Sequence, residues 1–92
     1  MKAHTKIYMD YFDYLECDNI FCELCGNIGV DIHHIEARGM GGSKLKDNIE
    51  NLICLCRNCH ENAHYQSLKD RYSKENLKKV HKEFMNIKKL HF

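Results

Sequence analysis

The chain has 92 residues, of which 43% are hydrophobic and 29% charged, and its formal net charge is +1 at pH 7. This length suits one domain, and the composition excludes a disordered or membrane-spanning chain. Asp10 and Asp13 interrupt the N-terminal stretch, so it does not have the apolar run of a signal peptide, and we expect a cytoplasmic protein. In that reducing compartment the six cysteines are expected to bind metal rather than to form disulfides.

The charges are distributed unevenly along the chain. Residues 1–37 carry two lysines and seven acids, a net charge of −5, whereas residues 38–68 carry four basic and three acidic residues, a net charge of +1. Residues 69–92 carry eight basic and three acidic residues, a net charge of +5. A basic segment of this kind can bind phosphates, and it can equally be the solvated face of a surface helix. The sequence leaves both interpretations open.

Apolar spacing predicts the elements in chain order. A helix is expected over about residues 4–16, with its aromatic stripe in the core. Residues 30–35 and 51–56 are short, apolar and rich in β-branched side chains, which predicts two strands joined by the glycine-rich loop 38–43. A short helix should follow Cys59, and a final helix should begin after Ser73 as its N-cap. Residues 1–92 then form a single domain with a core at about 17–66 and a basic helical extension at about 67–92.

Four cysteines form two C-x2-C pairs, which are Cys22 with Cys25 and Cys56 with Cys59. Two such pairs can supply a tetrahedral set of four thiolates, which leaves no open coordination position and therefore indicates a structural zinc site. The alternative is that these cysteines are simply buried apolar residues. Cys17 and Cys54 belong to neither pair, and we do not expect them to bind the metal.

Four of the seven histidines lie near the cysteine pairs. His33 and His34 end the first predicted strand, whereas His60 and His64 are four residues apart and so share one face of a helix. This pattern favours a second metal site. Adjacent residues of a regular strand point to opposite faces, so His33 and His34 can serve one site only if the strand is distorted or ends there.

Together these motifs resemble the HNH endonucleases, including their many phage-encoded members. The resemblance covers about residues 17–66, and the three residues that correspond to the family's name are His34, Asn51 and His60. The motifs that carry it are Cys22-x2-Cys25, Asp31-Ile32-His33-His34-Ile35, the Gly41-Gly42 loop, Asn51-Leu52-Ile53-Cys54-Leu55-Cys56 and Cys59-His60.

The resemblance implies an α+β fold in which a small ββα-metal core with structural zinc is flanked by N- and C-terminal helices. It also implies that His34 is the general base and that Asn51 pins the hairpin loop. His33 and His60 would bind one catalytic divalent ion, which could be Mg²⁺, Mn²⁺, Ni²⁺ or Zn²⁺, and His64 would be a third ligand. Many members of the family have asparagine at the position of His60 and lack the histidine of position 64, so the preferred metal stays open.

The expected function is metal-dependent hydrolysis of DNA phosphodiester bonds with little sequence preference. The resemblance implies products with 5′-phosphate and 3′-hydroxyl ends, and RNA stays open as a substrate. Arg38 is a candidate phosphate clamp or an ordinary loop arginine. The alternative is a non-catalytic zinc module that binds nucleic acid or protein. A third hypothesis, compatible with the first, is an accessory subunit of a larger phage or host DNA-processing complex. No membrane partner is expected.

Overall fold

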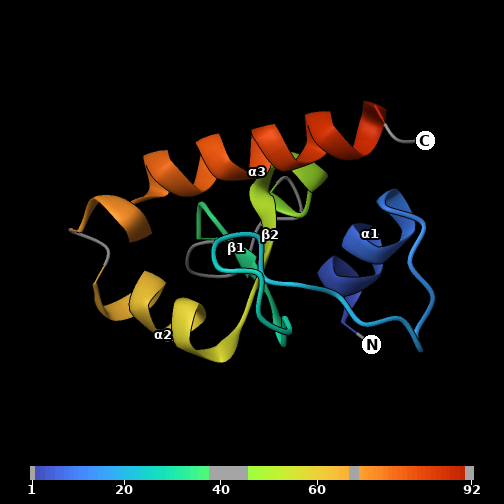
Figure 1. The fold of residues 1–92 in the computed structure, drawn as a ribbon, viewed down its shortest axis with the longest axis horizontal. Coiled ribbons are helices and arrows are strands. Elements are labelled where there is room, and N and C mark those ends of the chain that lie inside the picture. Colours follow the sequence, from blue (N-terminus) through green and yellow to red (C-terminus); the bar gives the residue numbers. More distant parts are fainter. Residues whose placement is uncertain (1, 38–45, 67–68, 91–92) are drawn as a thin grey trace.

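The computed structural model describes residues 2–37, 46–66 and 69–90. Its elements are α1 (Ala3–Tyr11), β1 (Asp31–His34), β2 (Leu52–Leu55), α2 (Arg57–Tyr65) and α3 (Lys74–Leu90), with short 3₁₀ turns η2 (Ile49–Asn51) and η3 (Asp70–Tyr72). In Figure 1 the β1–β2 hairpin lies at the centre, α3 crosses one side of it, and α1 and α2 lie at opposite ends. The expected α+β fold is confirmed. No helix within the described ranges is long and apolar enough to span a membrane.

Several element boundaries differ from the sequence prediction. Helix α1 ends at Tyr11 rather than near residue 16, because Asp13 adopts the left-handed conformation with φ of 60°. Helix α2 begins at Arg57, before Cys59, since the Cys56 sulfur accepts a hydrogen bond from the Cys59 N–H at 3.4 Å and caps the helix. Both strands are shorter than expected. The predicted loop 38–43 lies outside the described residues.

Strand β2 is the structural centre, because all four of its residues are buried. It pairs antiparallel with β1, and Asp31 lies opposite Leu55 while His34 lies opposite Leu52. Alternate side chains of a strand point to opposite faces. Accordingly, Leu52 and Cys54 pack into a cluster with α1, whereas Ile53 and Leu55 pack into a second cluster with α2 and the start of α3.

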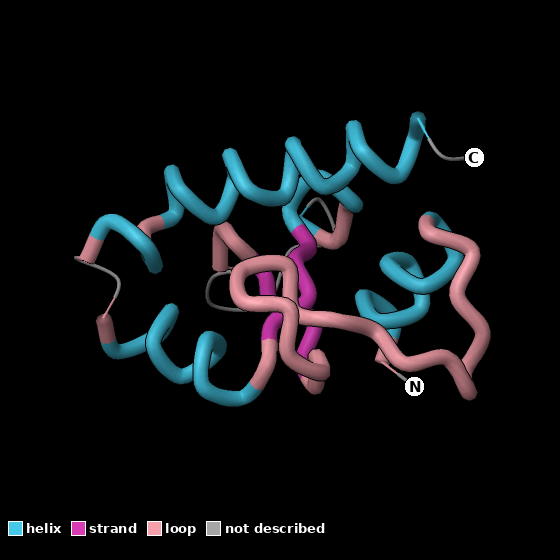
Figure 2. Tube along the Cα trace, viewed as in Figure 1, coloured by secondary structure: helices cyan, strands magenta, loops and turns pink. Residues whose placement is uncertain are grey.

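The irregular segment between α1 and β1 wraps across the hairpin, as Figure 2 shows. It turns at Gly26, whose φ of 81° is strained for residues with a Cβ. Gly29 then approaches the buried Cys54 so closely that a Cβ at this position would collide with the cysteine sulfur. Cys54 is therefore a packing residue, and burial, followed by the charge of Glu23, raises its pKa to about 12.

Helix α3 begins as the sequence predicts. Ser73 Oγ accepts a hydrogen bond from the Asn76 N–H at 3.1 Å, which is the N-cap interaction. Leu77 is 2% exposed and packs into the α2-side cluster, while Phe84 packs against the cluster formed with α1. One face of α3 therefore covers both halves of the core.

A buried polar network fastens α3 to the cysteine-bearing segment. The Glu23 carboxylate lies 2.8 Å from His81 Nδ1 and also accepts hydrogen bonds from the Tyr8 hydroxyl at 2.6 Å and the Cys54 N–H at 3.2 Å. His81 Nε2 lies 2.6 Å from the Ile49 carbonyl oxygen, so each ring nitrogen faces an acceptor. The Glu23 and His81 side chains are 0% and 1% exposed. The Glu23 carboxylate thus has three polar partners and the His81 ring has two.

We expect His81→Ala to lower the free energy of unfolding by about 3–5 kcal/mol, because it leaves the Glu23 carboxylate buried without its partner. Urea denaturation of the zinc-loaded protein measures the change. Lys79→Ala, on the exposed side of the same helix, should stay within about 0.5 kcal/mol of the parent. Equal stability of the two variants would show that the pair does not fasten α3.

Candidate metal centres and active site

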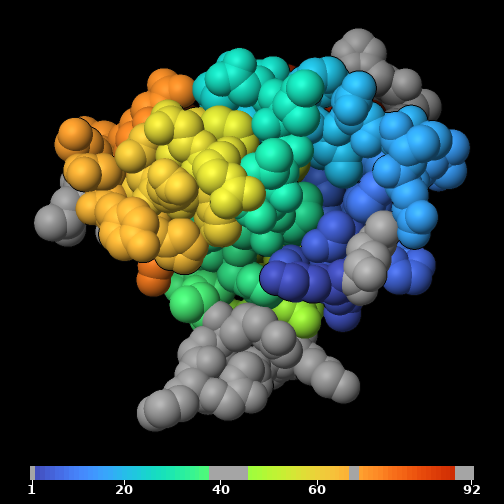
Figure 3. Space-filling model, turned by 90° about the horizontal axis from the view of Figure 1, so that it is seen from below, coloured from blue at the N-terminus to red at the C-terminus, as the bar shows by residue number. Residues whose placement is uncertain are grey.

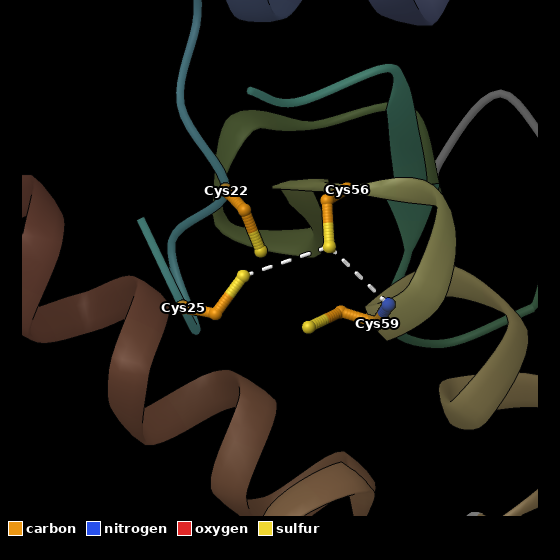
Figure 4. Close-up of side chains that lie close together, drawn as sticks. All are labelled: Cys22, Cys25, Cys56 and Cys59. Atoms are coloured by element: carbon orange, nitrogen blue, oxygen red, sulfur yellow. Dashed lines mark hydrogen bonds between the residues drawn. The ribbon is translucent and has the colours of Figure 1, made fainter. Parts of the chain in front are cut away.

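Four cysteines from two distant segments come together at one point. Cys22 and Cys25 lie in the turn before β1, whereas Cys56 and Cys59 lie at the junction of β2 and α2. Their Sγ atoms all lie within 4.8 Å of one another, and in Figure 4 the four side chains point toward a common centre. The Cys25 and Cys56 sulfurs are 3.6 Å apart, close to the ~3.8 Å between two thiolates on one tetrahedral zinc. The set therefore fits a structural zinc ion.

All six cysteines are free of disulfides, and the four that cluster are mostly buried. Burial acts to raise the pKa of Cys56, but hydrogen bonds from the Cys59 backbone and from neighbouring thiols outweigh it and lower that pKa below its usual value. Burial raises the pKa of Cys59 instead. The pKa values of these two thiols are therefore shifted in opposite directions. A cation that holds all four cysteines as thiolates would stabilise the cluster.

Three histidines form a second cluster between β1 and α2. The candidate ligand nitrogens of His33, His60 and His64 lie within 4.8 Å of one another. The Nε2 atoms of His60 and His64 are 3.1 Å apart, within the ~2.9–3.4 Å expected for two imidazoles on one metal. The four-residue spacing on α2 therefore brings the two rings together as the sequence predicts.

Asp31 orients one of these rings. Its Oδ2 lies 2.9 Å from His60 Nδ1. Because a carboxylate accepts, this nitrogen carries the hydrogen, and the lone pair of neutral His60 is then on Nε2, which faces His64. Burial, followed by the neighbouring imidazoles of His60 and His64, lowers the pKa of His33 to about 4, so His33 is neutral at physiological pH. His33 is thus in the protonation state that metal binding requires.

His34 lies on the other side of β1 and contacts different residues. Its Nε2 lies 2.6 Å from the Asp47 carboxylate, and its ring centroid is 4.6 Å from that of His4 in α1. The carboxylate assigns the hydrogen to Nε2, so neutral His34 has its lone pair on Nδ1. Burial, followed by the charge of His34, lowers the pKa of His4.

A single groove connects the two sides of the strand. Because β1 ends at His34, a cavity of about 480 Å³ reaches around its end and is lined by His33, His34, His60 and His64. Figure 3 shows α2, the β1 segment and the start of α1 next to one another on one face of the molecule. Adjacent residues of a strand point to opposite faces, but His33 and His34 can both line this groove because β1 ends at His34. The pairing of β1 with β2 remains regular.

Asn51 holds the two ends of the β1–β2 connection together. Its Oδ1 accepts a hydrogen bond from the Glu36 N–H at 2.7 Å, and its Nδ2 donates to the Glu36 and Lys46 carbonyl oxygens at 3.0 and 2.8 Å. Asn51 is 7% exposed. Its side chain is thus placed to hold together the two ends of the loop that connects β1 with β2.

Sequence reasoning missed His4 and Asp47 as neighbours of His34. No motif marks either residue, because their contacts with His34 form only when α1 and the end of the connecting loop fold against β1. Asp31, the first residue of the strand motif, contacts His60. Arg38, the candidate phosphate clamp, lies outside the described residues.

Residues 22–66 match the family described as HNH endonuclease. The chain therefore contains an HNH endonuclease family domain, which confirms the resemblance in its motifs, and this assignment indicates a metal-dependent nuclease that acts on nucleic acid. The matched residues include both cysteine pairs and four of the five histidines that line the groove, which are His33, His34, His60 and His64. No curated protein and no solved structure showed significant similarity to the chain.

We expect Cys22→Ser to lose bound zinc and most of the native circular dichroism, because a small domain with a divided core depends on its metal for stability. Elemental analysis and circular dichroism measure the two effects. Cys17→Ser, an exposed cysteine outside the cluster, should change neither. A folded Cys22→Ser protein with unchanged zinc content would contradict the structural role of the cluster.

Proposed function

We propose that the chain is a metal-dependent endonuclease that hydrolyses DNA phosphodiester bonds with little sequence preference. The observation that carries this proposal is the shared groove, which brings His34 and the three-histidine cluster to one surface. A phosphate in that groove would lie between a candidate base and a candidate cation site.

His34 is the proposed general base. Asp47 fixes its tautomer and ring orientation, so Nδ1 takes the proton from a water molecule as that water attacks phosphorus. The new bond forms between the water oxygen and phosphorus while the bond to the 3′-oxygen breaks, and the 3′-oxygen then acquires a proton from solvent. Asn51 keeps the end of β1 in place beside the groove by holding the Glu36 backbone.

His33, His60 and His64 would hold the catalytic divalent ion. When bound, such an ion stabilises negative charge on the phosphate and on the departing oxygen. Asp31 makes His60 a better ligand because it fixes the hydrogen on the opposite ring nitrogen. The four cysteines would hold the structural zinc, which has no open position for substrate.

The small size of the folded domain supports low sequence preference. A chain of 92 residues offers little surface for reading base edges once the groove and the core are accounted for. Thiols that bind zinc must stay reduced, which supports a cytoplasmic location for the activity. Cleavage by the isolated chain would distinguish a self-sufficient nuclease from an accessory subunit of a larger phage or host DNA-processing complex.

A non-catalytic zinc module is the competing hypothesis. Such a module requires the four cysteines but gives no role to a histidine oriented by a carboxylate beside a three-histidine cluster. The endonuclease proposal accounts for both features, which is why we favour it.

Replacement of the proposed base gives the sharpest test. His34→Ala should lower the rate of plasmid nicking by about 10²–10⁴-fold, the usual contribution of a general base, while the bound zinc stays unchanged. Glu83→Gln, on an exposed part of α3 and purified in the same way, should nick at the parent rate. Parent-like nicking by His34→Ala would reject His34 as the base.

Removal of metal separates the two candidate sites. A mild chelator should stop nicking without changing the circular dichroism, because histidine ligands release a divalent ion more readily than four thiolates release zinc. Added Mg²⁺, Mn²⁺, Ni²⁺ or Zn²⁺ should restore activity, and the order of rates identifies the preferred ion. Nicking that is indifferent to the chelator would contradict a metal-dependent mechanism.

A further inference from the structure

Glu36 lies between lysines at the exit of strand β1. Its carboxylate accepts a hydrogen bond from Lys78 Nζ at 2.7 Å and lies 3.7 Å from Lys74 Nζ. The hydrogen bond from Lys78, followed by the charges of Lys78 and Lys74, lowers the pKa of Glu36, and Lys46 contributes in the same direction. Two ammonium groups thus contact one carboxylate, and the charge of Lys46 adds to theirs.

These lysines lie together because the fold places them there. Lys74 and Lys78 are one helical turn apart on α3, and Lys82 follows one turn later on the same flank. Lys46 is brought to the same place by Asn51, whose side chain bonds to the backbone of both Lys46 and Glu36. The flank that carries Lys79 and Glu83 lies on another side of α3. The basic charge of the C-terminal segment is therefore partly gathered on one flank.

The lysine flank continues directly from the candidate active site. Lys74 lines the groove that contains His33, His34, His60 and His64. Lys78 and Lys82 line a neighbouring cavity of about 440 Å³ along α3, where Glu50 is the acidic residue that faces them. Cationic side chains therefore extend from the groove along the helix for two further turns.

The Glu36 carboxylate lies where a phosphate group would be expected to bind. It is an anion in contact with two ammonium groups, and both lysines remain more than half exposed, with 60% and 53% of their side chains accessible. Exposed ion pairs of this kind contribute little to stability, so a phosphate can replace the carboxylate at small cost. Since DNA carries phosphates at regular intervals, the flank fits a strand that leaves the groove.

We propose that Lys46, Lys74 and Lys78 form a phosphate-binding patch for the DNA backbone next to the cleaved bond, and that Glu36 occupies this patch until DNA displaces it. Lys82 extends the patch along α3. This patch is assigned to DNA because the proposed endonuclease function names DNA as the substrate, and to that extent the inference rests on the proposed function. It adds a path for the flanking strand and an acidic residue that weakens DNA binding.

The test compares two variants with the same change in net charge. Glu36→Gln frees the lysines, whereas Glu83→Gln removes an exposed acid from another side of α3. Binding of a short fluorescein-labelled DNA duplex is followed by anisotropy over a series of salt concentrations, with the full zinc-loaded chain in the His34→Ala background so that no cleavage intervenes. Thermal melting of each variant reports stability.

We expect Glu36→Gln to tighten DNA binding about two- to fivefold and to steepen the salt dependence by about one released counterion. Glu83→Gln should change the affinity by less than about 1.5-fold, because it alters only the overall net charge, whose effect is screened by salt. Lys78→Gln should weaken binding more than its sequence neighbour Lys79→Gln. Equal effects of the two glutamate variants, or weaker binding by Glu36→Gln, would overturn the proposal.

This result is independent of the cleavage chemistry. If His34→Ala still nicks DNA but Glu36→Gln tightens binding, the assignment of the base fails and the patch stands. If nicking depends on His34 and metal but the glutamate variants are indistinguishable, the endonuclease function stands and the patch fails.

Discussion

Four sulfur atoms from two segments far apart in sequence determine where the rest of the molecule lies. Cys56 and Cys59 mark the passage from β2 into α2, and Cys22 and Cys25 attach the irregular segment before β1 to the same point. His60 follows the last cysteine directly, so its position depends on this attachment. Glu23 lies between the first two cysteines and binds Tyr8 of α1 and His81 of α3. The cysteine cluster therefore supports the helices as well as the histidine site.

The candidate active site uses the geometry of a strand end. His33 and His34 point to opposite sides of β1, where one joins the histidines of α2 and the other contacts Asp47 and His4. A groove around the end of the strand makes both accessible to one substrate. Two of these rings are oriented by carboxylates, since Asp31 faces His60 and Asp47 faces His34. In each case the carboxylate determines which nitrogen keeps the lone pair.

Local pattern in the sequence was enough to predict the hairpin, the helices that flank it, the two cysteine pairs and the partnership of His60 with His64. Each depends on short-range spacing, such as the alternation in β2 or the four-residue repeat on α2. The positions of His4, Asp47 and Glu23 were not predictable in this way, because their partners are 13 or more residues away in the sequence. The end of α1 was also missed, since the left-handed conformation of Asp13 has no periodic signature. The sequence could not separate the two interpretations of the basic C-terminal segment, because the contacts of Glu36 with Lys74 and Lys78 form only when α3 packs beside the end of β1.

Anomalous diffraction from crystals grown with zinc and manganese would test the central claim most directly. The account predicts two separate sites: zinc bound by Cys22, Cys25, Cys56 and Cys59, and a second ion in contact with His33, His60 and His64, with His34 facing the same groove. A single metal at the cysteines, with the three histidines turned away from one another and the groove closed, would contradict it.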